Sequence, residues 1–91
     1  MKLSPGDLVW LVDDHLGSVD LYRDLDDNVW FDDPSEGNVV IGRLSPDAVG
    51  VALEVREWKS PESGCRMGFA VRVLSPTGTG WIPEELICKI K

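Results

Sequence analysis

Short apolar runs separated by turn-forming residues dominate this chain. Pro or Gly recurs at short intervals from Pro5 to Pro83, and few windows of twelve residues lack one, which disfavours long helices. The runs between these turns are rich in β-branched and aromatic residues, as in Leu8–Val12 and Val39–Ile41. Many short strands of this kind predict an all-β protein, either a small barrel or a sandwich.

Two longer segments show the alternation of a strand with one buried face. In the first, apolar residues recur at every second position with charged residues between them (apolar Val49, Val51, Leu53 and Val55; charged Glu54 and Arg56). In the second, Phe69, Val71 and Val73 repeat the pattern. Period-two alternation predicts strands, and we expect Phe69 to lie in the core. The polar segment from Lys59 to Arg66 is predicted to join the two strands.

One segment near the C-terminus predicts a helical turn. Pro83 suits the first helical position, and the acids Glu84 and Glu85 suit the positive end of the helix dipole. Only Leu86 separates them from a last apolar strand at Ile87–Ile90. A single 3₁₀ turn fits this length better than an α-helix.

The run Gly78-Thr79-Gly80-Trp81-Ile82-Pro83-Glu84-Glu85-Leu86-Ile87 joins a Gly-aromatic strand, a short turn and a closing strand. With Val40–Leu44, Val49–Val55 and Val71–Val73 before it, the sequence from Val39 to Lys91 resembles the bacterial SH3 domain family. The resemblance implies a single SH3-like barrel over residues 1–91, filled in part by Trp81, with a protein or peptide contact at its rim. Gly68 and Leu86 stand at two aromatic positions of the family's peptide groove, so we expect no binding of generic proline-rich peptides.

Negative charge is concentrated in one part of the chain. The 91 residues carry 16 acids against 9 Lys and Arg, a net charge of −7. Nine of the acids and one base, Arg23, lie between Asp13 and Glu36, so this segment alone carries −8. We predict an extended acidic N-terminal loop or hairpin here, with Leu8–Val12 and Val19–Tyr22 as the hairpin strands. Two interpretations remain open, a hydrated solubilising loop and a surface that steers a basic partner.

The candidate contact residues are aromatic side chains and the acids beside them. Trp30 and Phe31 are adjacent in sequence, so on a strand one of them must face outward. Trp58 stands at a predicted strand end beside a polar loop. Aromatic residues are favoured anchors of protein interfaces, and nearby charge raises the rate of encounter. The predicted partner-binding residues are Trp30, Phe31, Asp26, Asp27, Asp32, Asp33 and Trp58.

No motif in the chain predicts catalysis, a metal or a cofactor. His15 is the only histidine, and no activated nucleophile is evident near it. Asp24–Asn28 begins like a calcium loop, but Val29 stands where the loop requires Gly and Ser35 where it requires Glu. The two cysteines form no Cys-x-x-Cys pair, so neither a zinc site nor a redox motif is expected. We expect free thiols in a reducing compartment, with Cys65 in a loop and Cys88 in the core, although an exported protein could form one disulfide.

The acidic balance argues against nucleic acid, whose phosphates need a surface of Lys and Arg. No apolar run approaches the ~20 residues of a membrane span, and Met1–Gly6 does not begin a signal peptide, so a cytoplasmic protein without membrane contact is expected. The sequence predicts a non-catalytic protein–protein interaction module with an acidic contact face. Two alternatives remain open: an acidic inhibitor or decoy of a basic protein, and a structural subunit of a larger assembly.

Overall fold

Turn-forming residues divide the chain into short antiparallel strands, as the sequence predicts. The computed structural model describes residues 3–12, 17–26, 28–31, 39–61, 64 and 66–90. Within these residues the chain is all-β, apart from two single helical turns, α1 (Asn28–Phe31) and η2 (Glu84–Leu86). The strands are β1 (Leu8–Leu11), β2 (Val19–Tyr22), β3 (Val40–Leu44), β4 (Gly50–Lys59), β5 (Arg66–Ser75), β6 (Gly78–Pro83) and β7 (Ile87–Lys89).

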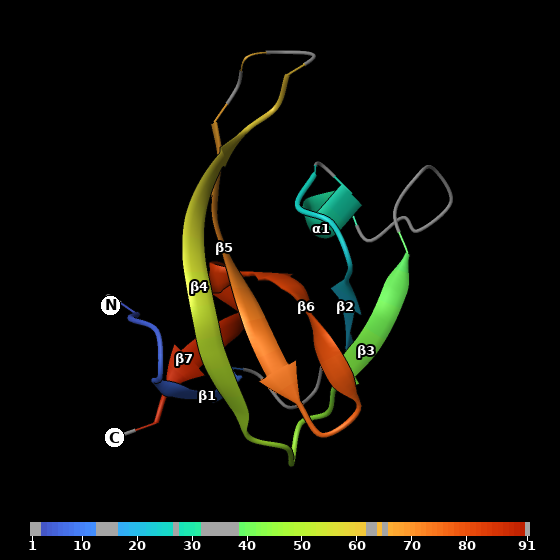
Figure 1. The fold of residues 1–91 in the computed structure, drawn as a ribbon, viewed down its shortest axis with the longest axis vertical. Helices are drawn as coiled ribbons and strands as arrows, with labels where there is room; N and C mark the ends of the chain where they lie inside the picture. The colour runs from blue at the N-terminus through green and yellow to red at the C-terminus, as the bar shows by residue number, and fades with distance from the viewer. Residues whose placement is uncertain are drawn as a thin grey trace.

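The strands form one sheet in the order β3-β2-β6-β5-β4-β1-β7, which curls into a half-barrel (Figure 1). Every pairing is antiparallel, and the long hairpin of β4 and β5 stands at the middle of the order. The predicted hairpin of Leu8–Val12 with Val19–Tyr22 is wrong. β1 instead pairs with β4 and β7, and β2 pairs with β3 and β6.

The concave side of the sheet holds the main core. Strand alternation turns Val9 and Leu11 of β1 inward, and β5 and β6 contribute side chains that are fully buried. Removing this apolar surface from water is the main stabilising contribution to the fold. The buried residues of this cluster are Leu3, Val9, Leu11, Leu21, Leu44, Ala52, Val71, Val73, Ile82 and Ile87.

A second, smaller cluster lies on the opposite face of β5 and β6. Trp81 of β6 is 6% exposed and pairs with Arg72. Because successive side chains of a strand point to opposite faces, Trp81 points away from its neighbour Ile82, which belongs to the main core. Trp81 is therefore buried, as predicted, but it packs outside the barrel rather than filling it. Tyr22, Val29 and Ala70 complete the cluster, with Leu25, Trp30 and Val40 packed against it.

The hydrophobic side of β4 differs from the predicted one. Gly50 and Ala52 are buried, whereas Val51 is half-buried and Val49 is 44% exposed. The inward positions must be small, because a side chain at Gly50 would collide with Val73 of β5. A register shift between Ala52 and Glu54 then changes the alternation farther along the strand.

Phe69 is 43% exposed, so its predicted place in the core is wrong. It lies near the end of the β4–β5 hairpin, opposite Glu57, where the hairpin projects beyond the other strands (Figure 1). The guanidinium of Arg66 lies 5.8 Å from the centre of its ring. The alternating apolar residues of β5 therefore extend beyond the part of the strand that faces the core.

The two helical turns have different outcomes. The 3₁₀ turn η2 follows Pro83 and is confirmed. The prediction that one of Trp30 and Phe31 faces outward rests on strand geometry, which does not apply, because both residues belong to α1. Buried Val29 anchors α1 against Tyr22 and Trp81, and its N–H donates to the carbonyl of Asp26 at 3.2 Å.

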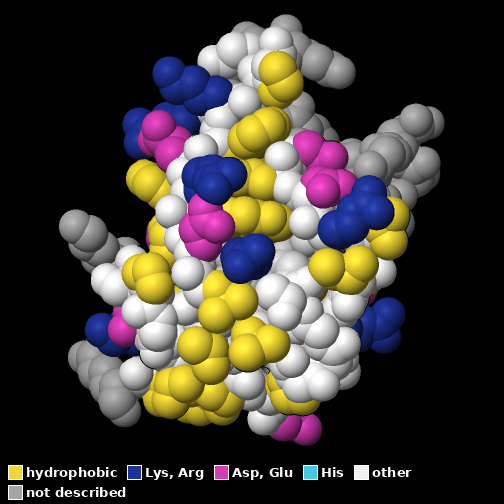
Figure 2. Space-filling view, viewed as in Figure 1, with side chains coloured by type: hydrophobic (Ala, Val, Ile, Leu, Met, Phe, Trp, Pro, Cys, Tyr) yellow, Lys and Arg dark blue, Asp and Glu magenta, His cyan; other side chains and the backbone are white. Residues whose placement is uncertain are grey.

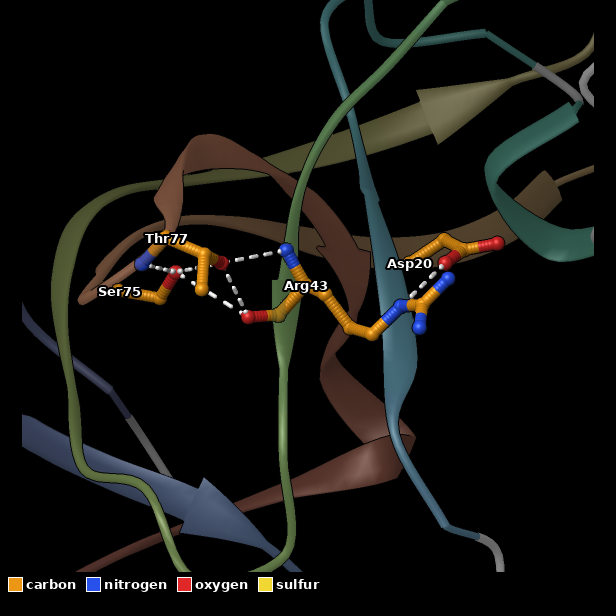
Figure 3. Close-up of polar contacts among 4 residues, drawn as sticks. All are labelled: Asp20, Arg43, Ser75 and Thr77. Atoms are coloured by element: carbon orange, nitrogen blue, oxygen red, sulfur yellow. Dashed lines mark hydrogen bonds and ion pairs between the residues drawn. The ribbon is translucent and has the colours of Figure 1, made fainter.

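Hydroxyl groups tie β3 to the turn between β5 and β6 (Figure 3). Thr77 Oγ1 donates to the carbonyl of Arg43 at 2.7 Å and accepts from the Arg43 N–H at 2.9 Å. Ser75 is buried, and its Oγ donates to the Gly78 carbonyl at 2.8 Å. Arg43 Nε in turn lies 3.3 Å from Asp20 Oδ1 on β2. These contacts hold the antiparallel pair of β2 and β3 beside β6, where the candidate site forms.

Candidate functional site

A pocket of about 270 Å³ lies where β2, α1 and η2 meet. β2 contributes Tyr22, which pairs with Trp81 of β6. α1 contributes Trp30, and Pro83 directs the chain from β6 into η2, where Glu85 and Leu86 follow. The lining residues are Ser18, Val19, Asp20, Tyr22, Val29, Trp30, Pro83, Glu85 and Leu86.

A second pocket, of about 250 Å³, adjoins the first. It is lined by Trp30, Gly68, Phe69, Glu84 and Glu85, so Trp30 and Glu85 are common to both pockets. Gly68 has a φ of +125°, a conformation that favours glycine. A Cβ added there would lie 3.9 Å from Trp30 Nε1. Trp30 thus lines both hollows, which together we call the Trp30 groove.

The Trp30 groove combines aromatic surface with negative charge. Among the described residues that line it, Asp20, Glu84 and Glu85 are acidic and none is Lys or Arg. Asp20 is paired with Arg43 across a solvent-exposed contact, which weakens its charge only in part. Glu85 is exposed and Glu84 is half-buried. Such a surface suits a cation, because a guanidinium or ammonium is attracted both to the face of an indole ring and to carboxylates.

The predicted contact residues have different places in the structure. Trp30 lines the groove and is half-buried. Trp58 is half-buried and lies opposite Gly68 in the β4–β5 register, so Trp30 and Trp58 are both neighbours of Gly68. Asp26 is half-buried just before α1. Phe31 belongs to α1, but its side chain lies outside the described residues, as do Asp27, Asp32 and Asp33.

Sequence reasoning missed several residues of the Trp30 groove. Tyr22 and Pro83 line it from β2 and β6, and Glu84 and Glu85 supply two of its three carboxylates. In the sequence, the acids of Pro83–Leu86 indicate only a helical turn. The sequence did contain a signal for the site, the adjacent acids Glu84 and Glu85. Charged side chains are rarely buried, so two acids on one short turn place negative charge at the surface.

No observation in the described residues points to catalysis or to a metal. Cys88 is a free, half-buried thiol rather than a core residue, while His15 and Cys65 lie outside the described residues. Residues 3–12, 17–26, 28–31, 39–61, 64 and 66–90 hold no cluster of three His, Cys, Asp or Glu that could bind a metal. The helical turns described in this structure are too short to span a membrane.

Comparison of the chain with protein-family models, with curated proteins and with solved structures gave no match.

Proposed function

We propose that this protein is a non-catalytic interaction module that binds a basic segment of another protein in the Trp30 groove. The observation that carries the proposal is that Trp30 and Glu85 line both hollows and that Glu84 lines the second. A bound Arg or Lys side chain would stack on the indole and pair with these carboxylates. The cation–π interaction is worth about 0.5–2 kcal/mol, and an exposed ion pair is worth about 0.2–1 kcal/mol.

We further propose that the domain is an SH3-like barrel. Three features support this: β1 lies between β4 and β7, the β4–β5–β6 strands run consecutively, and a 3₁₀ turn joins β6 to β7. The proposed module differs from a proline-reading groove, because Gly68 and Leu86 bring no aromatic ring to the Trp30 groove.

The acidic segment has a role in this proposal that differs from that of the groove. Asp26 lies just before α1, and Asp27, Asp32 and Asp33 flank the same turn in sequence. Charge spread over a segment attracts a basic partner over a distance and raises the association rate. Trp30, Phe31 and Trp58 would then supply the contacts that determine how slowly the partner dissociates.

A peptide of alternating Arg and Gly tests the proposal, with a matched peptide that has citrulline in place of each Arg. Citrulline keeps the shape of the side chain but removes its charge. We expect the dissociation constant, measured by fluorescence titration, to be at least tenfold lower for the Arg peptide, about 1.4 kcal/mol of binding free energy. We also expect this difference to shrink at high salt. A proline-rich peptide without basic residues should not bind measurably. Equal affinity for the Arg and citrulline peptides would contradict the proposal.

Matched variants localise the binding. Glu85→Gln removes one charge from the groove, and Asp47→Asn removes one from an exposed turn after β3. Trp30→Ala removes the ring of the groove, and Trp10→Ala removes a 46% exposed ring on β1. We expect weaker binding of the Arg peptide only for Glu85→Gln and Trp30→Ala. If Asp47→Asn weakened binding as much as Glu85→Gln, and Trp10→Ala as much as Trp30→Ala, the peptide would bind outside the Trp30 groove.

A further inference from the structure

An apolar patch lies on the outer face of β1, β4, β5 and β7. Alternation turns Leu8 and Trp10 outward from β1, where they are 47% and 46% exposed. Val51 lies opposite Leu8, and Leu74, which is 46% exposed, lies opposite Val51. Cys88 lies opposite Trp10 on β7. The register therefore joins these side chains into one surface across four strands. We call it the outer patch, and its members are Leu8, Trp10, Val12, Val49, Val51, Leu74 and Cys88.

Among the described residues, the outer patch and the Trp30 groove have no member in common, and they adjoin where the Val12 N–H donates to the Leu86 carbonyl at 3.0 Å. β1 and β7 end the strand order on one side, whereas β2 and β3 end it on the other. Figure 2 shows hydrophobic side chains gathered over the lower part of the molecule, where β4 begins and β5 ends, with charged side chains mostly above them. The nearby charged residues Asp7 and Lys89 pair with each other, with Lys89 Nζ 3.6 Å from Asp7 Oδ1.

The size of the outer patch suits a weak interface. A half-exposed aliphatic or aromatic side chain offers roughly 60–120 Å² of surface, so the patch presents several hundred Å², as functional patches on small proteins do. Two such patches facing each other would bury roughly 800 Å² or more in total, below the standard size of a specific interface and within reach of a reversible one.

We infer that the outer patch is the surface through which this protein forms a twofold-symmetric dimer. A twofold interface brings the same surface of both copies together, so the surface must be complementary to itself. The outer patch meets this requirement, because its members are all uncharged and strand faces stack readily. The acidic segment cannot meet it, because two negative surfaces repel each other.

Sedimentation velocity over a range of protein concentrations tests the dimer. We expect the wild-type protein to change from monomer to dimer as concentration rises to the millimolar range. Because each copy carries a net charge of −7, added salt should strengthen the dimer by screening the repulsion. The double variant Leu8→Lys/Leu74→Lys should remain a monomer throughout. The matched control Ile41→Lys, at a 41% exposed residue of β3, should dimerise like the wild type.

A measurement on the unmodified protein covers the case in which the double variant fails to fold. Methyl NMR signals of Leu8, Val51 and Leu74 should shift with wild-type concentration, while that of Ile41 should stay constant. A monomer at every concentration would overturn the inference and leave the outer patch to a different partner. A dimer would also overturn it if Leu8→Lys/Leu74→Lys left it intact or if Ile41 shifted in place of the patch.

Discussion

Replacing Trp81 by alanine is expected to lower the free energy of unfolding by about 3–5 kcal/mol, the usual cost of truncating a buried aromatic residue. The indole is 6% exposed. It packs against Tyr22 of β2 and Val29 of α1 on the outer face of the sheet, so it holds the helical turn against the strands. The guanidinium of Arg56 lies over the ring, 5.6 Å from its centre. The loss is a large part of the stability of a domain of this size.

Denaturant titration followed by circular dichroism measures this change. The matched control is Phe69→Ala, which also removes an aromatic ring but at a position that is 43% exposed. We expect the control to cost less than about 1 kcal/mol, as surface substitutions do. A loss below about 1 kcal/mol for Trp81→Ala would show that the second cluster does not stabilise the domain.

Gly80→Ala is expected to destabilise the protein by about 3 kcal/mol, toward the upper end of the usual cost of overpacking. A Cβ at this position would lie 2.7 Å from Leu21 Cβ and 2.8 Å from the carbonyl oxygen of Tyr22. Backbone atoms in a paired strand cannot move aside as a flexible side chain can. The substitution should therefore push β2 away from β6 and weaken binding of the Arg peptide, because Tyr22 lines the Trp30 groove.

Gly64→Ala is the control for Gly80→Ala. Gly64 has a φ of +70° and no atom within 4 Å of an added Cβ, so alanine there meets conformational strain of roughly 1–2 kcal/mol but no collision. Both free energies come from thermal or denaturant unfolding. Equal costs for the two variants, or unchanged peptide binding in Gly80→Ala, would contradict the close approach of β2 to β6.

The strands could be predicted because each is specified by its local residues. Alternation and turn-forming residues marked β4 and β5, and Pro83 with its two acids marked η2. Which strands pair could not be obtained in this way. β1 and β2 are neighbours in sequence, yet β1 pairs with β4 and β7, which lie far along the chain. Pairing depends on contacts between distant residues, and a local pattern carries little information about them.

Burial was harder to predict than secondary structure. Phe69 lies on the same face of β5 as Val71 and Val73, but only the two valines are buried in the core. On β4 the small residues Gly50 and Ala52 face the core, because Val73 already fills the space opposite Gly50. Period-two alternation therefore indicated both strands correctly, but it gave the wrong buried face at the start of β4 and at Phe69.

The candidate site was predictable only in part. Trp30 could be found because a large aromatic residue within an acidic segment is unusual. Its partners Glu84 and Glu85 are more than fifty residues away in sequence and reach it only through the folding of η2 beside α1. Sequence proximity had instead directed attention to Asp32 and Asp33, which lie outside the described residues.

The most direct test of the central claim is an NMR titration of the isotope-labelled protein with the Arg–Gly peptide, followed at backbone amides and indole N–H groups. The proposed function predicts saturable shifts at the Trp30 indole and at the amides of Gly68, Glu84 and Glu85, and no shifts at the Trp10 indole. The citrulline peptide should produce none of them. Shifts confined to other surfaces, or no shifts with the Arg–Gly peptide at low salt, would contradict binding at the Trp30 groove.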